Sequence, residues 1–202
     1  MSILTVTDLS KSFGGVTVFS DLNLTLKRGF TCLYGPSGCG KTTLGRILAG
    51  LERADGGSVQ GLVDETTVLF QEPRLLPSVS ALTNVSCVSE RRDAAQAATD
   101  LLAALGFSQE DCQKKPSELS GGMQQRVAIA RALLYAEERQ STFVLLDEPF
   151  RGLDGETKAQ AASLLKQRLS DRIVLVITHD EEDAVLLAAA VISFERFANP
   201  KK

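Results

Sequence analysis

Residues 35–42 read Gly35-Pro36-Ser37-Gly38-Cys39-Gly40-Lys41-Thr42, and this stretch decides the fold. It matches the phosphate-binding pattern G-x-x-x-x-G-K-[ST]. Glycines let the backbone wrap tightly, so that successive N–H groups point inward at an anion. Lys41 is placed to reach the β- and γ-phosphates of a nucleotide, and the Thr42 hydroxyl is placed to bind Mg²⁺. The stretch therefore predicts a nucleotide-phosphate site rather than an ordinary glycine turn.

The residues on either side of this loop supply the structural context that it needs. Residues 30–34 form a short strand-like segment, and residues 41–50 are predicted to be a helix with an apolar stripe. In the order strand, glycine loop, helix, the helix N-terminus adds its partial positive charge to the anion site.

Composition narrows the class of protein. The chain has 202 residues, 44% of them hydrophobic, with a net charge of −3. This length suits one domain with a sizeable core. Because there is no basic excess, nothing indicates nucleic acid as a partner. The longest apolar run, residues 184–192, is too short to span a bilayer, and the N-terminus has no signal pattern. We expect a cytoplasmic protein with no transmembrane segment.

The hydrophobic pattern predicts a mixed α/β fold. Residues 3–9 and 16–26 alternate between apolar and polar, which favours antiparallel strands, and residues 55–57 are predicted to be a turn. Residues 142–146 and 173–177 are continuously apolar, as in parallel strands that are covered on both faces. Residues 80–105 are predicted to be largely helical, residues 120–139 to form a long helix, and residues 155–169 to be helical.

Two acids follow the first of these apolar strands. Asp147 and Glu148 stand at its carboxyl end, which in open α/β sheets is the edge where ligands bind. Asp147 is placed to hold Mg²⁺ through water, and Glu148 to polarise an attacking water. With a phosphate loop upstream, this interpretation is favoured over a pair of solvated acids in a turn.

A second anion site is predicted at residues 119–126, Leu-Ser-Gly-Gly-Met-Gln-Gln-Arg. Ser120 is an N-cap candidate, and two glycines open the first turn of the helix that follows. A serine hydroxyl, free N–H groups and a helix dipole can hold an anion. One nucleotide needs only one such cradle, so the second cradle is expected to serve a nucleotide held by another copy.

The order of these motifs resembles the ATP-binding subunit of bacterial ABC transporters, and the resemblance covers essentially the whole chain. It implies a P-loop NTPase (RecA-like) fold with a parallel sheet core, an N-terminal antiparallel β subdomain and an inserted helical subdomain. The implied organisation is one ATPase domain over residues 1–202, with the helical subdomain at about 72–135. Residues 70–77 and 147–150 are similar to the subunits of nitrate, sulfonate and taurine importers.

The resemblance also implies a role for each matching residue. Phe13 is expected to stack on adenine, and a core position for Phe13 is an equal alternative. The implied ATP contacts include Phe13 and the phosphate loop with the residue after it: Gly35, Pro36, Ser37, Gly38, Cys39, Gly40, Lys41, Thr42 and Thr43. The implied catalytic residues are Glu148, His179 and Gln71, and the implied Mg²⁺ ligands are Thr42, Gln71 and Asp147. The segment that acts on the partner's ATP comprises Leu119, Ser120, Gly121, Gly122 and Gln124. Asp154 is expected to communicate across the dimer, or alternatively to cap the helix that follows it.

The implied function is ATP hydrolysis that powers solute transport, by ATP-driven closure of a dimer and reopening after hydrolysis. An importer is favoured, and an exporter subunit or a non-transport ABC ATPase is the alternative. The implied cofactors are ATP and Mg²⁺. The implied partners are a second copy or a homologous ATPase subunit, integral membrane permease subunits and a separate solute-binding protein, at the cytoplasmic face of the membrane. Residues 75–82 are expected either to dock the permease or to pack as core of the helical subdomain.

Overall fold

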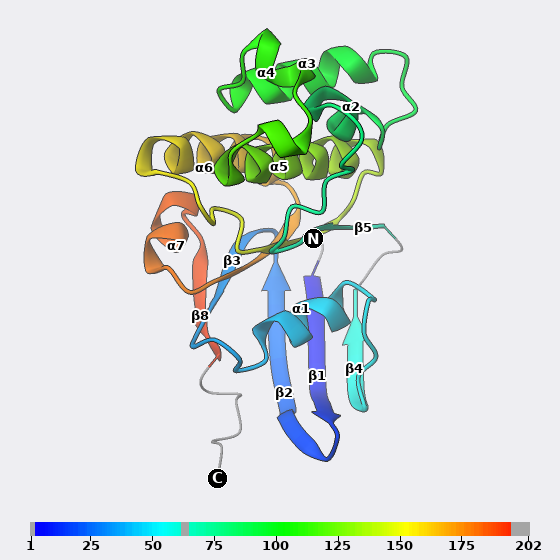
Figure 1. Ribbon diagram of the computed structural model, residues 1–202. Helices are drawn as coiled ribbons and strands as arrows, with labels where there is room; N and C mark the ends of the chain where they lie inside the picture. The colour runs from blue at the N-terminus through cyan, green and yellow to red at the C-terminus, as the bar shows by residue number, and fades with distance from the viewer. Residues whose placement is uncertain (1–2, 62–64, 195–202) are drawn as a thin grey trace.

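Five short strands pair in parallel to form the central sheet of the computed structural model, which describes residues 3–61 and 65–194 (Figure 1). In spatial order they are β5 (Thr66–Leu69), β6 (Phe143–Asp147), β7 (Ile173–Thr178), β3 (Gly29–Tyr34) and β8 (Ala190–Ser193). Every residue of β6 and β7 is buried. The prediction of two continuously apolar parallel strands is therefore confirmed.

The two faces of this sheet belong to two different cores. In β6, Phe143 and Leu145 pack into the core that holds α1 (Lys41–Leu48) and the N-terminal strands. Val144 and Leu146, which point the other way, pack into the larger core with the other helices. Successive side chains of a strand alternate between faces, so a strand covered on both sides must be apolar throughout.

The N-terminal strands form a separate antiparallel sheet in the order β2-β1-β4. These strands are β1 (Ile3–Phe13), β2 (Val16–Lys27) and β4 (Gly56–Gln60). The first two were predicted over residues 3–9 and 16–26, and the structure extends β1 to Phe13. The fold class is confirmed: a parallel core, an N-terminal antiparallel sheet and an inserted group of helices.

The turn predicted at residues 55–57 is wrong, because Gly56 and Gly57 begin β4 and pair with β1. Gly57 has φ +85°, and Asp8 across the ladder has φ +49°. The register slips between Thr7 and Ser10 at this point, as at a β-bulge. A left-handed glycine inside a bulge has the same sequence signature as a turn glycine, and only the partner strand distinguishes the two.

Apart from α1, which packs on the opposite face, the described helices gather on one side of the central sheet (Figure 1). α5 and α6 lie across it, and α2, α3 and α4 lie beyond them. The helices not yet given are α2 (Ala81–Ser86), α3 (Ala94–Ala104), α4 (Gln109–Gln113), the 3₁₀ turn η1 (Pro116–Glu118), α5 (Gly121–Glu138), α6 (Gly155–Leu169) and α7 (Glu181–Leu187). None of those described is both long enough and apolar enough to cross a bilayer.

The largely helical stretch predicted over residues 80–105 consists of α2 and α3, which are separated by residues 87–93. Four consecutive charged residues, 90–93, leave this stretch without an apolar stripe to pack on α5. The helices predicted at 120–139 and 155–169 are confirmed, with Ser120 and Asp154 as their N-caps. The single-domain division, with a helical subdomain at about 72–135, stays a prediction.

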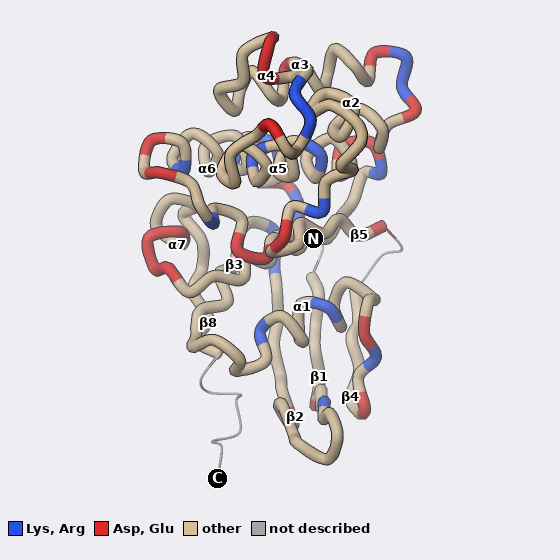
Figure 2. Tube along the Cα trace, viewed as in Figure 1, with Lys and Arg blue, Asp and Glu red and all other residues tan. Residues whose placement is uncertain are grey.

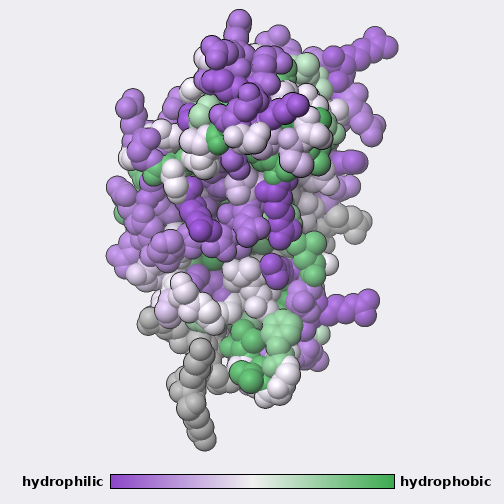
Figure 3. Space-filling model, in the orientation of Figure 1, coloured by the Kyte–Doolittle hydropathy of each residue, from purple (hydrophilic) through white to green (hydrophobic). Residues whose placement is uncertain are grey.

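Charge and hydropathy vary over the surface. The acidic first turn of α7 stands out in Figure 2, where Glu181, Glu182 and Asp183 follow one another. Apolar atoms gather around the β1–β2 turn in Figure 3. Phe13 and Val16, which pair across that turn, are 49% and 68% exposed.

We predict that Gly57→Ala destabilises the antiparallel sheet. A Cβ at Gly57 would lie 2.5 Å from the Asp8 carbonyl oxygen, and the positive φ adds strain of about 1–3 kcal/mol. Urea unfolding measures the free energy of unfolding. Gly14→Ala is the matched control, because Gly14 also has a positive φ but its Cβ would meet no described atom within 4 Å. Equal losses in the two variants would contradict the predicted backbone clash.

Candidate nucleotide site at the carboxyl edge of the sheet

The loop between β3 and α1 is shaped by two left-handed glycines, Gly38 with φ +77° and Gly40 with φ +109°. A Cβ at Gly40 would lie 2.6 Å from Cγ1 of Val18. The loop is thus pressed against β2, where only glycine fits. Gly40 caps α1 without a side-chain hydrogen bond. The first N–H groups of α1 are therefore available to an anion.

Lys41 is 7% exposed and folds back over its own loop. Its ammonium donates hydrogen bonds to the carbonyl oxygens of Gly35 at 2.6 Å and Pro36 at 2.9 Å, and lies 3.8 Å from the sulfur of Cys39. These contacts hold the positive charge at the mouth of the loop. Gly35, Pro36 and Cys39 therefore position Lys41.

A first cavity, of about 330 Å³, lies over this loop. It brings together most of the predicted phosphate and magnesium residues with Glu148. The lining residues are Val18, Ser37, Gly38, Gly40, Lys41, Thr42, Thr43, Gln71, Asp147, Glu148 and Ile177. Val18 and Ile177 were not predicted from the sequence, since apolar strand residues carry no signal for a ligand. Phe13 is not among the described residues that line this cavity.

Asp147 ends β6 at the floor of the first cavity and is 6% exposed. Burial raises its pKa, and the neighbouring charge of Glu148 raises it further, while a hydrogen bond from the Thr42 side chain acts the other way. A nearby cation stabilises the charged form of a buried carboxylate whose pKa is raised in this way. Asp147, Thr42 and Gln71 all border the first cavity, and all three supply oxygen ligands. They therefore form a donor set that suits Mg²⁺.

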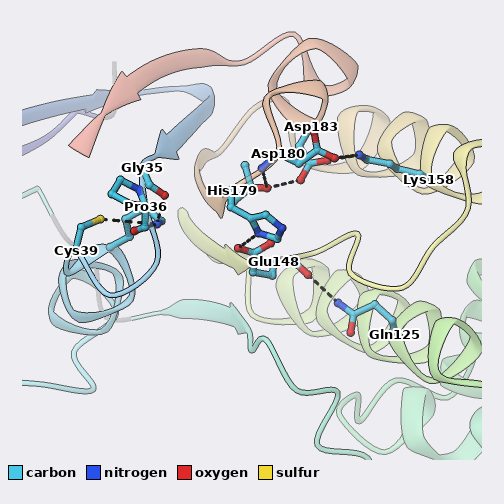
Figure 4. A network of polar contacts seen from close by, with 11 residues as sticks. Gly35, Pro36, Cys39, Gln125, Glu148, Lys158, His179, Asp180 and Asp183 are labelled. Carbon is cyan, nitrogen blue, oxygen red and sulfur yellow. Dashed lines mark hydrogen bonds and ion pairs between the residues drawn. The ribbon is translucent and has the colours of Figure 1, made fainter. Parts of the chain in front are cut away.

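Glu148, which lines the first cavity, pairs with His179, which lines another cavity that Glu148 also borders (Figure 4). Nδ1 of His179 lies 2.8 Å from Oε1 of Glu148. The histidine side chain is 69% exposed, whereas that of the glutamate is 14% exposed. The hydrogen bond and the charge of Glu148 raise the pKa of His179. The carboxylate thereby fixes the ring and favours its protonated form.

Lys158 of α6 anchors the segment that carries His179. Its ammonium contacts three carboxylates: Asp180 at 2.6 Å, Asp183 at 2.7 Å and Glu182 at 3.2 Å. Burial acts to lower the pKa of Lys158, but these carboxylates outweigh it and raise the pKa overall. Asp183 is buried and also accepts from the Thr178 hydroxyl. The chain after β7 is thus tied to α6, a link that no motif in the sequence indicated.

The second predicted anion cradle lies apart from the first cavity. Gly121, Gly122 and Gln124 line a second cavity of about 550 Å³, together with Gln71, Glu72, Pro73, Gln125, Arg151 and Gly152. Ser120 caps α5 by accepting from the Met123 N–H at 3.2 Å, and Leu119 is buried. Within the part of the chain that the structure describes, none of these cradle residues lines the first cavity. Gln71 is the residue that borders both cavities.

Asp154 has a structural task of its own. It caps α6 by accepting from the Thr157 N–H at 2.9 Å and the Thr157 hydroxyl at 3.1 Å. The N–H of Thr157 lowers the pKa of Asp154, and its hydroxyl adds to this effect. The proposed communication across a dimer would add to this capping role.

We predict that Glu148→Gln lowers the pKa of His179, because the amide cannot hold the charged imidazole as a carboxylate does. His179 is the only histidine in the chain, so one NMR titration curve reports it. In the unaltered chain the raised pKa means that the pair stabilises the fold fully below the ordinary histidine pKa of about 6.5. That contribution disappears as pH rises through the folded-state value. An unchanged titration curve in the variant would rule out this pairing in solution.

Comparison with known proteins gives this geometry a context. Residues 19–151 match the family described as ABC transporter. The aliphatic sulfonates import ATP-binding protein SsuB 1 of Nocardia farcinica is 45% identical, over 96% of this chain and 78% of the relative. The corresponding SsuB 3 protein of Rhodococcus jostii is 43% identical, over 94% of this chain and 70% of the relative.

Solved structures agree with this family match. The ATP-binding cassette MJ0796, in a dimeric post-hydrolysis state bound to ADP and Pi, is 26% identical with a TM-score of 0.80. The alignment covers 95% of this chain and 94% of the cassette. The family match spans more than half of the chain, and the two relatives are 45% and 43% identical to it over most of its length. The chain therefore belongs to the ABC transporter family.

Proposed function

We propose that this chain is the ATP-hydrolysing subunit that powers solute import by a membrane ABC transporter. The observation that carries this proposal is the first cavity, where a phosphate loop, two acids and a glutamine converge. Its relatives are named import ATP-binding proteins. They are named for aliphatic sulfonates, and we extend that solute class to this chain as part of the proposal.

The phosphates of ATP bind over residues 35–43. The N–H groups at the start of α1 and the ammonium of Lys41 neutralise phosphate charge. Thr42, Gln71 and Asp147 would hold Mg²⁺, which when bound offsets the charge that develops on the phosphates. Phe13 is 49% exposed beyond the first cavity, where an adenine ring can stack on it.

Hydrolysis falls to the pair of Glu148 and His179. Glu148 is within reach of the first cavity and accepts a proton from the attacking water. Nδ1 of His179 faces the Glu148 carboxylate, so this nitrogen carries a proton. In the imidazolium form, which the raised pKa favours, Nε2 also carries a proton that it can donate to a phosphate oxygen. Gln71, on the wall of the same cavity, orients the water.

A second copy completes the site. The cradle of Leu119, Ser120, Gly121, Gly122 and Gln124 borders its own cavity rather than the first one, so it is free to cover the phosphates bound by a partner. ATP binding and dimer closure are then one linked equilibrium. Closure excludes bulk water and aligns Glu148 with the water molecule that attacks the phosphate. Hydrolysis then lets the dimer reopen.

Mixing two inactive variants tests this shared site. Lys41→Ala removes the phosphate cation, and Ser120→Arg blocks the cradle. A mixed dimer holds one site with both defects and one intact site. We predict that mixing restores roughly a quarter of the unaltered ATPase rate, because about half of the dimers are mixed and each has one working site of two. Phosphate release measures the rate.

Each variant alone is the control for this experiment, and the double variant Lys41→Ala/Ser120→Arg should stay inactive when mixed with either single variant. No recovery on mixing, with all variants folded and able to dimerise, would contradict the shared site. Hydrolysis by isolated protomers at the full rate would contradict it as well.

The permease is proposed to dock beside the chain after Gln71. Leu75 and Leu82 pack against the helical core, whereas Leu76 is 48% exposed. The two alternatives expected for residues 75–82 thus apply to different residues. Leu75 and Leu82 pack as core, whereas Leu76 offers an apolar contact to the permease. In this arrangement the chain sits at the cytoplasmic face of the membrane, and a separate solute-binding protein delivers the solute.

We predict that Leu76→Glu uncouples transport from ATP hydrolysis. The charge disrupts an apolar contact with the permease but leaves the first cavity unaltered, so solute uptake falls while basal ATPase activity stays within about twofold. Uptake in reconstituted vesicles and phosphate release measure the two activities. Val185→Glu, at a position on α7 that is 79% exposed, is the matched control. Normal uptake with Leu76→Glu would place the permease elsewhere.

A further inference from the structure

We propose that Gln125 is a positioning residue for Glu148, and that it links the second anion cradle to the catalytic carboxylate of the same copy. Its amide Nε2 donates to the carbonyl oxygens of Glu148 at 3.3 Å and Pro149 at 3.0 Å (Figure 4). Gln125 is 2% exposed. The inference rests on the proposed function, since it concerns the residue to which hydrolysis is assigned.

The backbone at Glu148 needs such support. Glu148 has φ +49°, a left-handed conformation that costs a non-glycine residue about 1 kcal/mol or more. Its N–H donates to the Ile177 carbonyl oxygen at 2.8 Å, which ties it to β7. Gln125 holds its carbonyl from the other side. The direction of the carboxylate toward His179 therefore depends on a backbone that is clamped between a strand and a helix.

The neighbouring glutamine has a different task. Gln124 donates to the carbonyl oxygens of Pro116 and Leu119, in the segment that leads into its own helix. Gln125 is one position further and contacts the chain after β6 instead. Gln124 thus holds the segment of the cradle, and Gln125 holds the residues that follow β6.

Helix geometry connects these contacts. Gln125 lies about one turn beyond the glycines that open α5, and an α-helix moves as a rigid body over that length. Gly122 is in close backbone contact as well, because a Cβ there would lie 2.7 Å from the Gly152 carbonyl oxygen. When the cradle of one copy contacts the phosphates of its partner, the displacement reaches Glu148 of the first copy through Gln125. Each nucleotide site thereby senses whether the other is engaged.

His179 makes this proposal measurable without nucleotide. We expect Gln125→Leu, which keeps a similar volume but has no donor, to weaken the hydrogen bond between Glu148 and His179. The pKa of the single histidine should then fall from its value in the unaltered chain toward that of Glu148→Gln. In the same variant, kcat should fall on the order of tenfold or more, while KM for Mg-ATP stays within about twofold.

Asn84→Leu is the matched control, because Asn84 is also a fully buried amide that holds loop carbonyls, those of Leu76, Val79 and Ser80. It should lower Tm and leave the histidine titration unchanged. If Gln125→Leu folds poorly, Gln125→Asn supplies the second variant, since its shorter amide cannot reach both carbonyls. An unchanged histidine titration and an unchanged kcat in a folded Gln125 variant would overturn the proposal.

The titration also separates this inference from the proposed function. It uses the full chain without nucleotide, so an unchanged pKa in the Gln125 variants counts against Gln125 alone. Failure of the unaltered, dimeric chain to hydrolyse Mg-ATP would instead count against the proposed function.

Discussion

Parallel pairing of three buried strands is the constraint on which the site depends. β7 lies between β6 and β3, and the pairing places Asp147 opposite Ile177 and Tyr34 opposite Thr178. The three strands therefore end at nearly the same level, and the segments that leave them meet at the same edge. The glycine loop comes after β3, Glu148 after β6 and His179 after β7. A slip of one register step in any pair would turn apolar side chains to the wrong core and move one of these groups away.

Around this edge, polar side chains fix the groups that the strands deliver. Lys41 is held by its own loop, and Lys158 ties the chain after β7 to α6 through three carboxylates. Gln125 holds the carbonyls after β6. Each of these side chains is at least nine-tenths buried. A buried charge or amide is stable only when its partners are in place, so these contacts restrict the edge to one arrangement.

The sequence predicted the elements whose signals are local. Asp154 and Ser120 mark the starts of α6 and α5 through capping, and continuous apolar runs mark β6 and β7. The phosphate loop was readable because its glycines impose one backbone shape. The residues predicted at this loop and at the end of β6 make up most of the lining of the first cavity.

Features that depend on distant partners were not readable. Gly57 belongs to a strand only because β1 lies beside it. The short elements α4 and β8 have too few residues to show a period. The partners of Gln125 lie beyond the end of its own helix, in the chain after β6, and no spacing in the sequence indicates them. The same holds for Lys158, whose three carboxylates are spread over another helix and the loop before it.

The position of β3 in the sheet has a consequence for synthesis. Both of its neighbours, β7 and β8, are encoded far downstream, from Ile173 onward. While the ribosome adds the intervening helices, this apolar strand has two open edges and no native neighbour to cover them. Such edges are templates for intermolecular pairing, and non-local contacts of this kind slow folding. Until translation has passed β8, the strand that leads into the phosphate loop is thus open to such pairing on both edges.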